Sequence, residues 1–371
     1  MKKILIILFL IVAVSIFSSS LSSDYTHLLK SIHSSQEFNN IYPYPLKNED
    51  SSEMGWGYFY QQLEPFWYVI GKYESHWSDL ENGLYLSNSL PYVTGLTSGF
   101  NLDKVRLIFG IYTFDPFLTD EEILVQKDGS IDQNSDRRRY PENGYIDPFK
   151  AFFIHRIDIL PFKNLRLSFS EINLVGGKFG DVVDFNPLGV THNTFGEGFS
   201  NAMLGIDASW NPIKGFQLYG QFALDDYVVP ATEAGAINYK PTGLAWGYGA
   251  RAVFKMNDFY IAPKAEYYKI YTWMYNRWQT LLTFTGRYDG IDYPMGFKHG
   301  ANMEGYLIGL DIFNNKGKYK VLFENYIKGD IDIDTPYDDP RKPLYEEYPW
   351  EGPAGELRKI IKVSFIFEFN I

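Results

Sequence analysis

Apolar and polar residues alternate one by one along many stretches of this chain, and this pattern limits the possible fold more than any other feature. In residues 201–210 the even positions are apolar, and after the turn NPIKG the stretch 216–225 alternates in the same way. A period of two residues describes a strand with one apolar and one polar face. Two such stretches joined by a short turn predict a β-hairpin.

Along the chain, short connections between these stretches alternate with long ones. Short connections lie at residues 102–104, 161–164, 211–215, 255–258 and 314–317, and long ones at about 114–147, 172–199, 226–243, 274–296 and 331–355. A membrane β-barrel has tight turns on the periplasmic side and long loops outside. We therefore predict an all-β fold over residues 55–371, an antiparallel transmembrane outer-membrane β-barrel of about 12 strands or a few more.

Four stretches are the least regular or the terminal strands of this predicted barrel. The aromatic residues 55–73 are expected to form the first strand, although it contains Pro65, and residues 84–100 the second. Residues 149–160 make a poor strand because Arg156 and Asp158 interrupt the apolar face. The last stretch, 357–371, is expected to face lipid with its odd positions. It should also pair with the first strand, since an open edge in lipid is costly, and carry the signal for the barrel-assembly machinery.

The beginning of the chain has the features of an export signal. Lys2 and Lys3 precede the apolar run 4–17, and small polar residues follow it. This order predicts a signal peptide over residues 1–23, because the run is shorter than the roughly 18 residues that a membrane helix needs. Residues 24–54 are expected to form a periplasmic segment with some helix. The chain is thus predicted to reach the outer membrane, with lipid as a partner, and its net charge of −11 argues against nucleic acid.

Charged side chains recur on the polar faces of the predicted strands, which point into the barrel. They could line a pore for polar solutes, or they could form cross-strand ion pairs that fill a narrow lumen. The second interpretation is favoured, because small barrels are largely filled by their own side chains. The candidate lumen charges are Arg106, Arg166, Asp207, Arg251, Lys264, Glu266, Lys320, Glu324 and Arg358.

Aromatic residues are frequent in the long connections. Their rings could stack on sugars, or they could form an interfacial girdle and pack within the loops. The candidate glycan contacts are Trp273, Tyr275, Trp278, Tyr345 and Trp350.

No motif indicates a metal, a cofactor or a catalytic centre. The six histidines lack a metal-ligand spacing, and the acidic run with Asp330, Asp332 and Asp334 lacks the glycine and glutamate of an EF-hand loop. His155 could face Ser170 across a tight hairpin, which would suggest a hydrolase. The Ser/His/Asn sequence pattern of outer-membrane phospholipases is absent, however, and we expect neither enzymatic activity nor a cofactor.

Residues 169–227 run from FSEINLVGG through an NP-containing loop and SNAMLGID to LYGQFALDD. This stretch resembles the core of the capsule assembly protein Wzi family. The matching positions are Asn186, Pro187, Asn201, Tyr219, Gln221, Asp225 and Asp226. The resemblance implies an outer-membrane barrel that binds or organises surface or capsular polysaccharide without catalysis. The alternatives are a porin-like channel for small or sugar-like solutes and, less favoured, an outer-membrane hydrolase.

Overall fold

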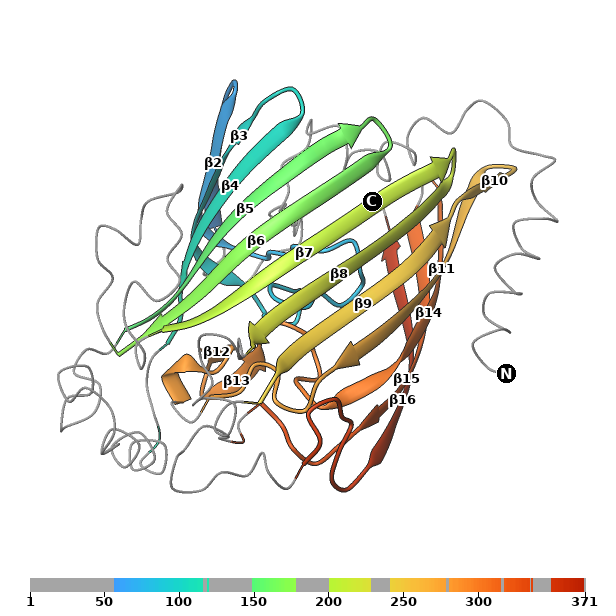
Figure 1. The fold of residues 1–371 in the computed structure, drawn as a ribbon. Coiled ribbons are helices and arrows are strands. Elements are labelled where there is room, and N and C mark those ends of the chain that lie inside the picture. Colours follow the sequence, from blue (N-terminus) through green and yellow to red (C-terminus); the bar gives the residue numbers. More distant parts are fainter. Residues whose placement is uncertain are drawn as a thin grey trace.

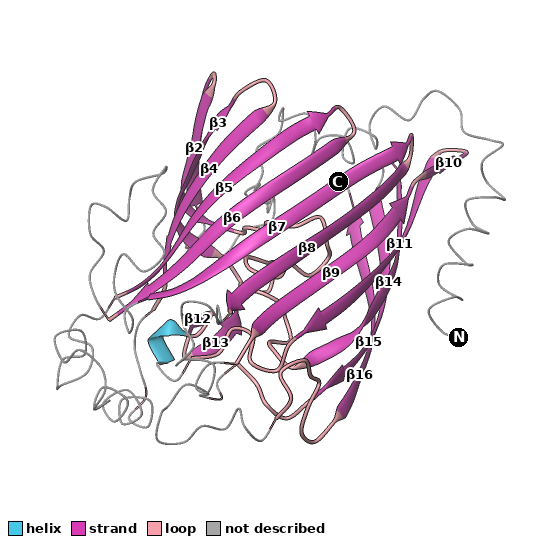
Figure 2. Ribbon diagram, viewed as in Figure 1, coloured by secondary structure: helices cyan, strands magenta, loops and turns pink. Residues whose placement is uncertain are grey.

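The fold consists almost entirely of β-strands (Figure 2). The computed structural model describes residues 57–115, 119, 149–177, 200–227, 241–277, 280–314, 317–333, 335 and 348–369. Among these residues, no helix is long and apolar enough to cross a membrane. The predicted signal peptide and the segment 24–54 lie outside the described residues.

The strands follow one another around a single sheet. They are β1 (Gly57–Leu63), β2 (Phe66–Tyr73), β3 (Val93–Asn101), β4 (Val105–Thr113), β5 (Lys150–Phe162), β6 (Leu165–Gly176), β7 (Ser200–Ile213), β8 (Phe216–Asp226), β9 (Gly243–Ala252), β10 (Phe254–Met256), β11 (Phe259–Ile270), β14 (Met303–Asn314), β15 (Gly317–Lys328) and β16 (Arg358–Phe369). A separate hairpin of β12 (Thr285–Tyr288) and β13 (Ile291–Pro294) follows the short helix η3 (Thr280–Leu282).

The large sheet has 14 antiparallel strands, of which β10 pairs only with β11. Its strands are tilted and curve around an interior (Figure 1). The all-β antiparallel class predicted from the alternation is confirmed, and strands begin and end at the short turns that the sequence indicated. The described strands do not close into a complete barrel, because no pairing joins β1 to β16.

The prediction of one strand over residues 55–73 is wrong. This stretch folds back at Glu64 and Pro65 into the hairpin β1–β2, with Gly57 opposite Lys72. Leaving out β10, the path from β1 to β16 therefore contains 13 of the 14 strands. Since each strand runs opposite to its neighbour, the first and the thirteenth run in the same direction. They therefore cannot pair as antiparallel neighbours, and the predicted contact between the first and last strands is not present among the described strands.

The second and fourth predicted strands also need correction. Residues 84–92 do not belong to a strand, because β3 begins only at Val93. The stretch expected to be poor is instead the long, regular strand β5, since Arg156 and Asp158 are buried on the inner face of the sheet while Ile157 between them is exposed outside. Charge on one face and apolar side chains on the other is the ordinary strand pattern.

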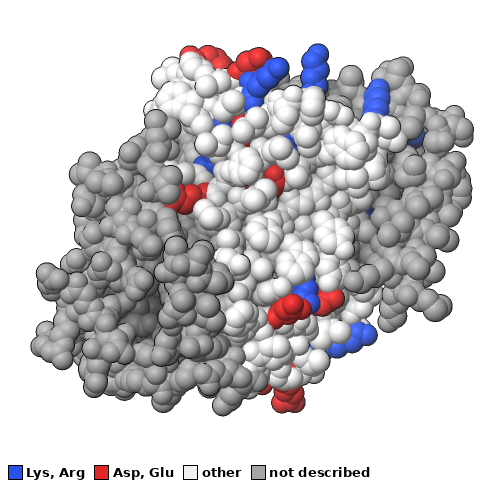
Figure 3. Space-filling model, in the orientation of Figure 1, with Lys and Arg blue, Asp and Glu red and all other residues white. Residues whose placement is uncertain are grey.

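The outer face of the sheet is apolar. Its exposed large side chains include Ile70, Phe100, Ile157, Phe169, Leu204, Ile206, Trp210, Leu218, Tyr248, Ile308, Val321, Ile361, Val363, Phe365 and Phe367. Figure 3 shows a broad uncharged surface, with charged side chains gathered toward its two ends. An apolar band between polar ends is what a sheet in contact with lipid requires.

Two connections fold into the interior of the sheet instead of leaving it. We call residues 74–92, between β2 and β3, the plug, and residues 271–302, between β11 and β14, the cover. Figure 1 shows the plug as blue loops within the curve of the sheet. Trp77 and Tyr85 of the plug belong to one core cluster together with Met274, Phe284 and Phe297 of the cover. The two segments thus form an apolar core inside the sheet.

Candidate functional site

The interior next to the short turns contains a buried network of wall charges. The guanidinium of Arg106 donates from Nε to Asp158 at 2.8 Å, and Arg156 Nε donates to the other oxygen of Asp158 at 2.6 Å. Arg156 Nη1 also reaches Asp207 at 3.0 Å. These side chains are almost completely buried, and each charge has a partner of opposite sign, as buried charges require.

The plug is held by charged wall residues that lie on four different strands. The Asp79 carboxylate accepts a hydrogen bond from Arg166 of β6, and Arg251 of β9 donates to the Asp79 backbone oxygen at 2.8 Å. Glu81 accepts from both Lys264 of β11 and Lys320 of β15. These contacts tie the plug to opposite parts of the sheet.

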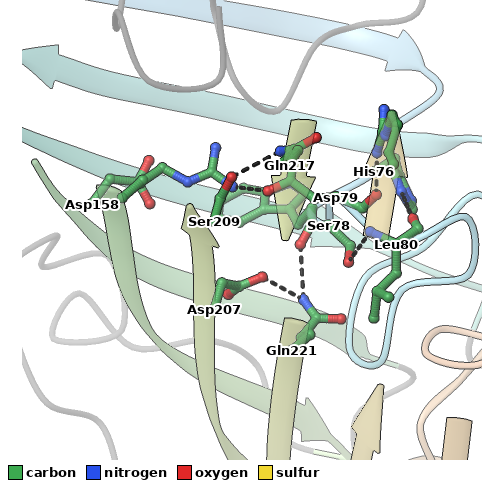
Figure 4. Close-up of polar contacts among 12 residues, drawn as sticks. His76, Ser78, Asp79, Leu80, Asp158, Asp207, Ser209, Gln217 and Gln221 are labelled. Carbon is green, nitrogen blue, oxygen red and sulfur yellow. Dashed lines mark hydrogen bonds and ion pairs between the residues drawn. The ribbon is translucent and has the colours of Figure 1, made fainter. Parts of the chain in front are cut away.

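A single amide on β8 also holds the plug. Gln221 accepts a hydrogen bond from the backbone N–H of Leu84 at 2.6 Å and donates to the Trp77 backbone oxygen at 3.0 Å. It donates in addition to Asp207 at 2.9 Å. Figure 4 shows Gln221 between Asp207 and the plug residues Ser78 and Asp79. Gln221 therefore links the wall charges to both sides of the plug turn.

Glu266 connects the plug with two tyrosines of the wall. Its carboxylate accepts hydrogen bonds from the hydroxyls of Tyr219, at 2.7 Å, and Tyr268, and from the backbone N–H of Glu81 at 3.0 Å. Burial alone would raise the pKa of the Glu81 carboxyl, but Lys264 and Lys320 hold it well below its usual range. Glu81 therefore stays charged in the docked plug.

The cover is anchored by Asn201, Asp225 and Asp226, which lie in the segment 169–227. Asp225 accepts a hydrogen bond from the Tyr275 backbone N–H at 2.8 Å, and Asp226 pairs with Arg277 at 2.7 Å. Asn201 accepts from Arg277 at 2.9 Å and donates to the backbone oxygen of Leu282 at 3.0 Å.

The described positions among those singled out in residues 169–227 therefore share one structural role. Tyr219 and Gln221 contact the plug or its partner Glu266, while Asn201, Asp225 and Asp226 contact the cover. Asn186 and Pro187 lie outside the described residues. The motif thus consists of anchors for segments that fold into the interior.

Two histidines of the inward segments are buried. Burial lowers the pKa of His76 in the plug, whose Nε2 lies 2.9 Å from the Leu80 backbone oxygen, although nearby acidic groups partly offset this. Burial, together with the positive charge of Lys298, lowers the pKa of His299 in the cover to about 4. Both imidazoles are neutral near pH 7.

The remaining candidate lumen charges lie closer to the long connections. Glu324 is buried and pairs with Lys298 of the cover at 2.5 Å. Arg358, at the beginning of β16, is 65 % exposed and lies 4.0 Å from Asp332. Asp332 also pairs with Lys328 at 3.0 Å, and Asp334 is not among the described residues. Arg358 therefore lies at the rim and not in the interior.

The aromatic candidates differ in their accessibility. Trp273 and Tyr275 are fully buried in the cover, so neither offers a ring face to a glycan. Trp350 is 39 % exposed, and its backbone oxygen accepts a hydrogen bond from Thr272 at 3.0 Å. Trp278 and Tyr345 lie outside the part whose side chains are described. The buried pair packs inside the protein because the cover folds inward, which the sequence pattern did not indicate.

The predicted opposition of His155 and Ser170 is wrong. In the β5–β6 register His155 faces Glu171, and its Nδ1 lies 3.3 Å from the Glu171 carboxylate, while Ser170 faces Arg156. The turn pairs Phe162 with Leu165, a register that would place His155 opposite Ile172, and the shift between Ile159 and Phe162 brings Glu171 opposite His155 instead.

Several residues of the site were not indicated by the sequence. Tyr85 lies at the beginning of residues 84–100, predicted as the second strand, whereas Asp79 and Glu81 come from a stretch in which alternation stops and serine, asparagine and glycine are frequent. Such a stretch signals a loop. It does not signal a loop that turns inward. The described residues contain no group of three or more His, Cys, Asp or Glu side chains placed to hold a metal ion.

The chain shows similarity to solved outer-membrane β-barrels. It is similar to Wzi, an outer-membrane carbohydrate-binding β-barrel involved in group 1 capsule assembly in Escherichia coli, with a TM-score of 0.48 and 14 % identity over 76 % of this chain and 59 % of that chain. A variant of OccD1 (OprD) has a TM-score of 0.35 and 10 % identity, with 82 % of this chain and 64 % of that chain covered. A FadL homologue of Pseudomonas aeruginosa has a TM-score of 0.30 and 10 % identity, with 72 % and 68 % covered.

The chain thus spans less than two thirds of the length of the Wzi and OccD1 chains. No protein-family model matches it, and no curated protein matches it significantly in sequence. These similarities concern the fold alone.

Proposed function

We propose that the protein is a non-enzymatic outer-membrane β-barrel that binds or organises surface polysaccharide and keeps its lumen closed to free diffusion. The observation that carries this proposal is the filled interior, where plug and cover side chains form one core cluster. A porin for free diffusion needs a water-filled passage. An interior occupied by packed side chains favours a role at the membrane surface.

The outer face supports the membrane location in this proposal. Its strands expose apolar side chains, and aromatic pairs such as Trp246 with Tyr271 lie where the strands meet the long connections. Their ring centroids are 5.4 Å apart. Aromatic rings at the ends of membrane strands form the girdles typical of the lipid interface.

The polysaccharide role is supported by the motif region and by an exposed aromatic residue. The positions that resemble the Wzi family anchor the inward segments, so the resemblance concerns residues with a shared structural task. Trp350 lies at the end of the sheet with the long connections, next to Thr272 of the cover. An indole there combines apolar area with a polar edge, as sugar rings require.

A combined conductance and binding experiment tests the proposal. The purified full chain is inserted into a planar bilayer, and its binding to polysaccharide extracted from the source cells is measured on an immobilised layer. We expect an inserted but electrically silent protein, saturable binding, and at least tenfold weaker binding for Trp350→Ala. Tyr248→Ala is the control, because Tyr248 is an exposed aromatic residue on the outer strand face. Steady conductance or the absence of saturable binding would overturn the proposal.

A further inference from the structure

Four basic residues of the wall converge on two acidic residues of the plug. We call Arg166, Arg251, Lys264 and Lys320 the basic cradle. Arg166 and Arg251 hold Asp79, and the two lysines hold the Glu81 carboxylate. The four residues come from β6, β9, β11 and β15. The cradle thus belongs to the sheet, while its counter-charges belong to a connection.

The sheet places like charges next to each other in the cradle. Arg251 of β9 lies directly opposite Lys264 of β11 in the strand register. Like charges opposite each other destabilise a sheet unless an anion lies between them. Arg106 and Arg156 differ in this respect, because their partners Asp158 and Asp207 are wall residues.

The carboxylates of the wall do not neutralise the positive charge of the cradle. Without the plug, the wall carboxylates near the cradle are Glu266, two residues from Lys264, and Asp311, opposite Lys320 in the register. Asp158 and Asp207 also lie near Arg166, but they are paired with Arg106 and Arg156. The six wall cations, with Arg106 and Arg156 included, minus these four carboxylates leave an excess of two positive charges. Glu266 also accepts hydrogen bonds from two tyrosine hydroxyls. An excess of positive charge on the wall attracts an anion whenever the plug is displaced.

Polar groups beside the cradle retain binding capacity. Gln217 faces Arg251 across the β8–β9 ladder, and the buried Gln217 Oε1 and Arg251 Nε have no hydrogen-bond partner. The Arg251 guanidinium lies 4.9 Å from the centre of the Tyr219 ring, which holds its orientation. The side chains of Asp79, Glu81 and Lys320 are 14 %, 15 % and 15 % exposed, so solvent reaches the cradle.

We propose that the lumen contains a binding site for carboxylate-bearing solutes, and that Asp79 and Glu81 of the plug occupy this site in the described conformation. The guanidinium groups and ammonium groups bind carboxylates, and Gln217 provides an acceptor for a hydroxyl group. A sugar acid has both kinds of group. This site goes beyond the proposed surface function, because it lies in the interior on the side of the short turns and does not depend on Trp350.

The test uses the double variant D79N/E81Q in the full chain. Both substitutions keep the side-chain shape and remove the internal carboxylates. Glucuronate is the probe and glucose the neutral probe of similar size, with binding measured by calorimetry in detergent. We expect glucuronate to bind the variant at least tenfold more tightly than the unmodified protein, and glucose to bind neither. The control D103N/D258N removes two charges from exposed turns and is expected to behave as the unmodified protein.

Further variants make each outcome decisive. Adding K264Q/K320Q to the double variant is expected to abolish glucuronate binding. Unchanged glucuronate affinity in D79N/E81Q, or equal binding of glucose, would overturn the proposal. Folding is checked by heat-modifiability on a gel, and if the double variant does not fold, the single variant E81Q is measured against the same criteria. Loss of polysaccharide binding in Trp350→Ala is independent of these results, so the two proposals fail separately.

Discussion

At Gln221, one side chain joins the strand wall to two separate positions of the plug. Its amide oxygen accepts from Leu84 N–H, and its amide nitrogen donates to the Trp77 oxygen and to Asp207. All three partners are buried. The contacts with the plug therefore explain why position 221 of β8 carries a polar side chain.

Replacing Gln221 by leucine should release the plug. The change keeps a similar volume but leaves the Leu84 N–H and the Trp77 oxygen without their partner, at about 1–3 kcal/mol for each buried group left unsatisfied. Asp207 loses one hydrogen bond and keeps its ion pair with Arg156. We expect cleavage within residues 74–92 by a soluble protease to accelerate at least tenfold. Gln62→Leu, on the exposed hairpin β1–β2, is the control. Equal cleavage rates in the two variants would show that Gln221 does not hold the plug.

At the scale of elements, the sequence predicted strands well and inward segments poorly. Period-two alternation identified β4, β7 to β9, β11 and β14 to β16, because these strands separate a polar from an apolar face. It missed the β1–β2 hairpin, where aromatic residues occupy both faces. The plug was missed for another reason, since its partners are distant in the chain and local periodicity carries no information about them.

The docking of plug and cover should weaken in mild acid. His76 and His299 have folded-state pKa values below the ordinary value of about 6.5, that of His299 at about 4, so the docked segments bind fewer protons than released ones. Their docking is therefore complete above pH 6.5 and weakens as the pH falls toward 4. Asp79, Glu81 and Glu266 act on His76, whereas Lys298, Glu324, Lys328 and Lys362 act on His299.

Hydrogen exchange checks this pH dependence. Protection factors of residues 74–92 and 271–302, corrected for the intrinsic exchange rate, are expected to be lower at pH 5 than at pH 7.5. In a His76→Gln/His299→Gln variant the difference should largely disappear, because the amide does not titrate in this range. If the protection factors of this variant depend on pH as those of the unmodified protein do, groups other than the two histidines cause the effect.

For the whole molecule, the two faces of the sheet have opposite chemistry. The outer face exposes aliphatic and aromatic side chains, and the inner face buries charges that are paired either within the wall or with the plug. The alternation predicted this division. It did not predict that the strand path would end with β1 and β16 in the same direction, because that follows from a turn at Pro65 within an aromatic stretch.

Lysine substitutions on the outer face test whether that face meets lipid. Ile206, in the middle of β7, is 44 % exposed, and Ile213 at its end is 55 % exposed. In a membrane, Ile206→Lys should cost about 2–4 kcal/mol and Ile213→Lys about 0–1 kcal/mol, because the penalty depends on depth. The free energies of unfolding from lipid vesicles provide the measurement. Similar costs at both positions would contradict a membrane-embedded sheet.

The position of the plug in the chain imposes an order on assembly. Glu81 and its partner Lys320 are 239 residues apart in sequence, and Lys264 is 183 residues away. Contacts between such distant residues form late, because the intervening chain must first be arranged. The plug is synthesised before most of the wall, yet it finds its counter-charges only after β15 is in place. Protection of the plug from protease should therefore appear as the last event of folding and would report that the wall is complete.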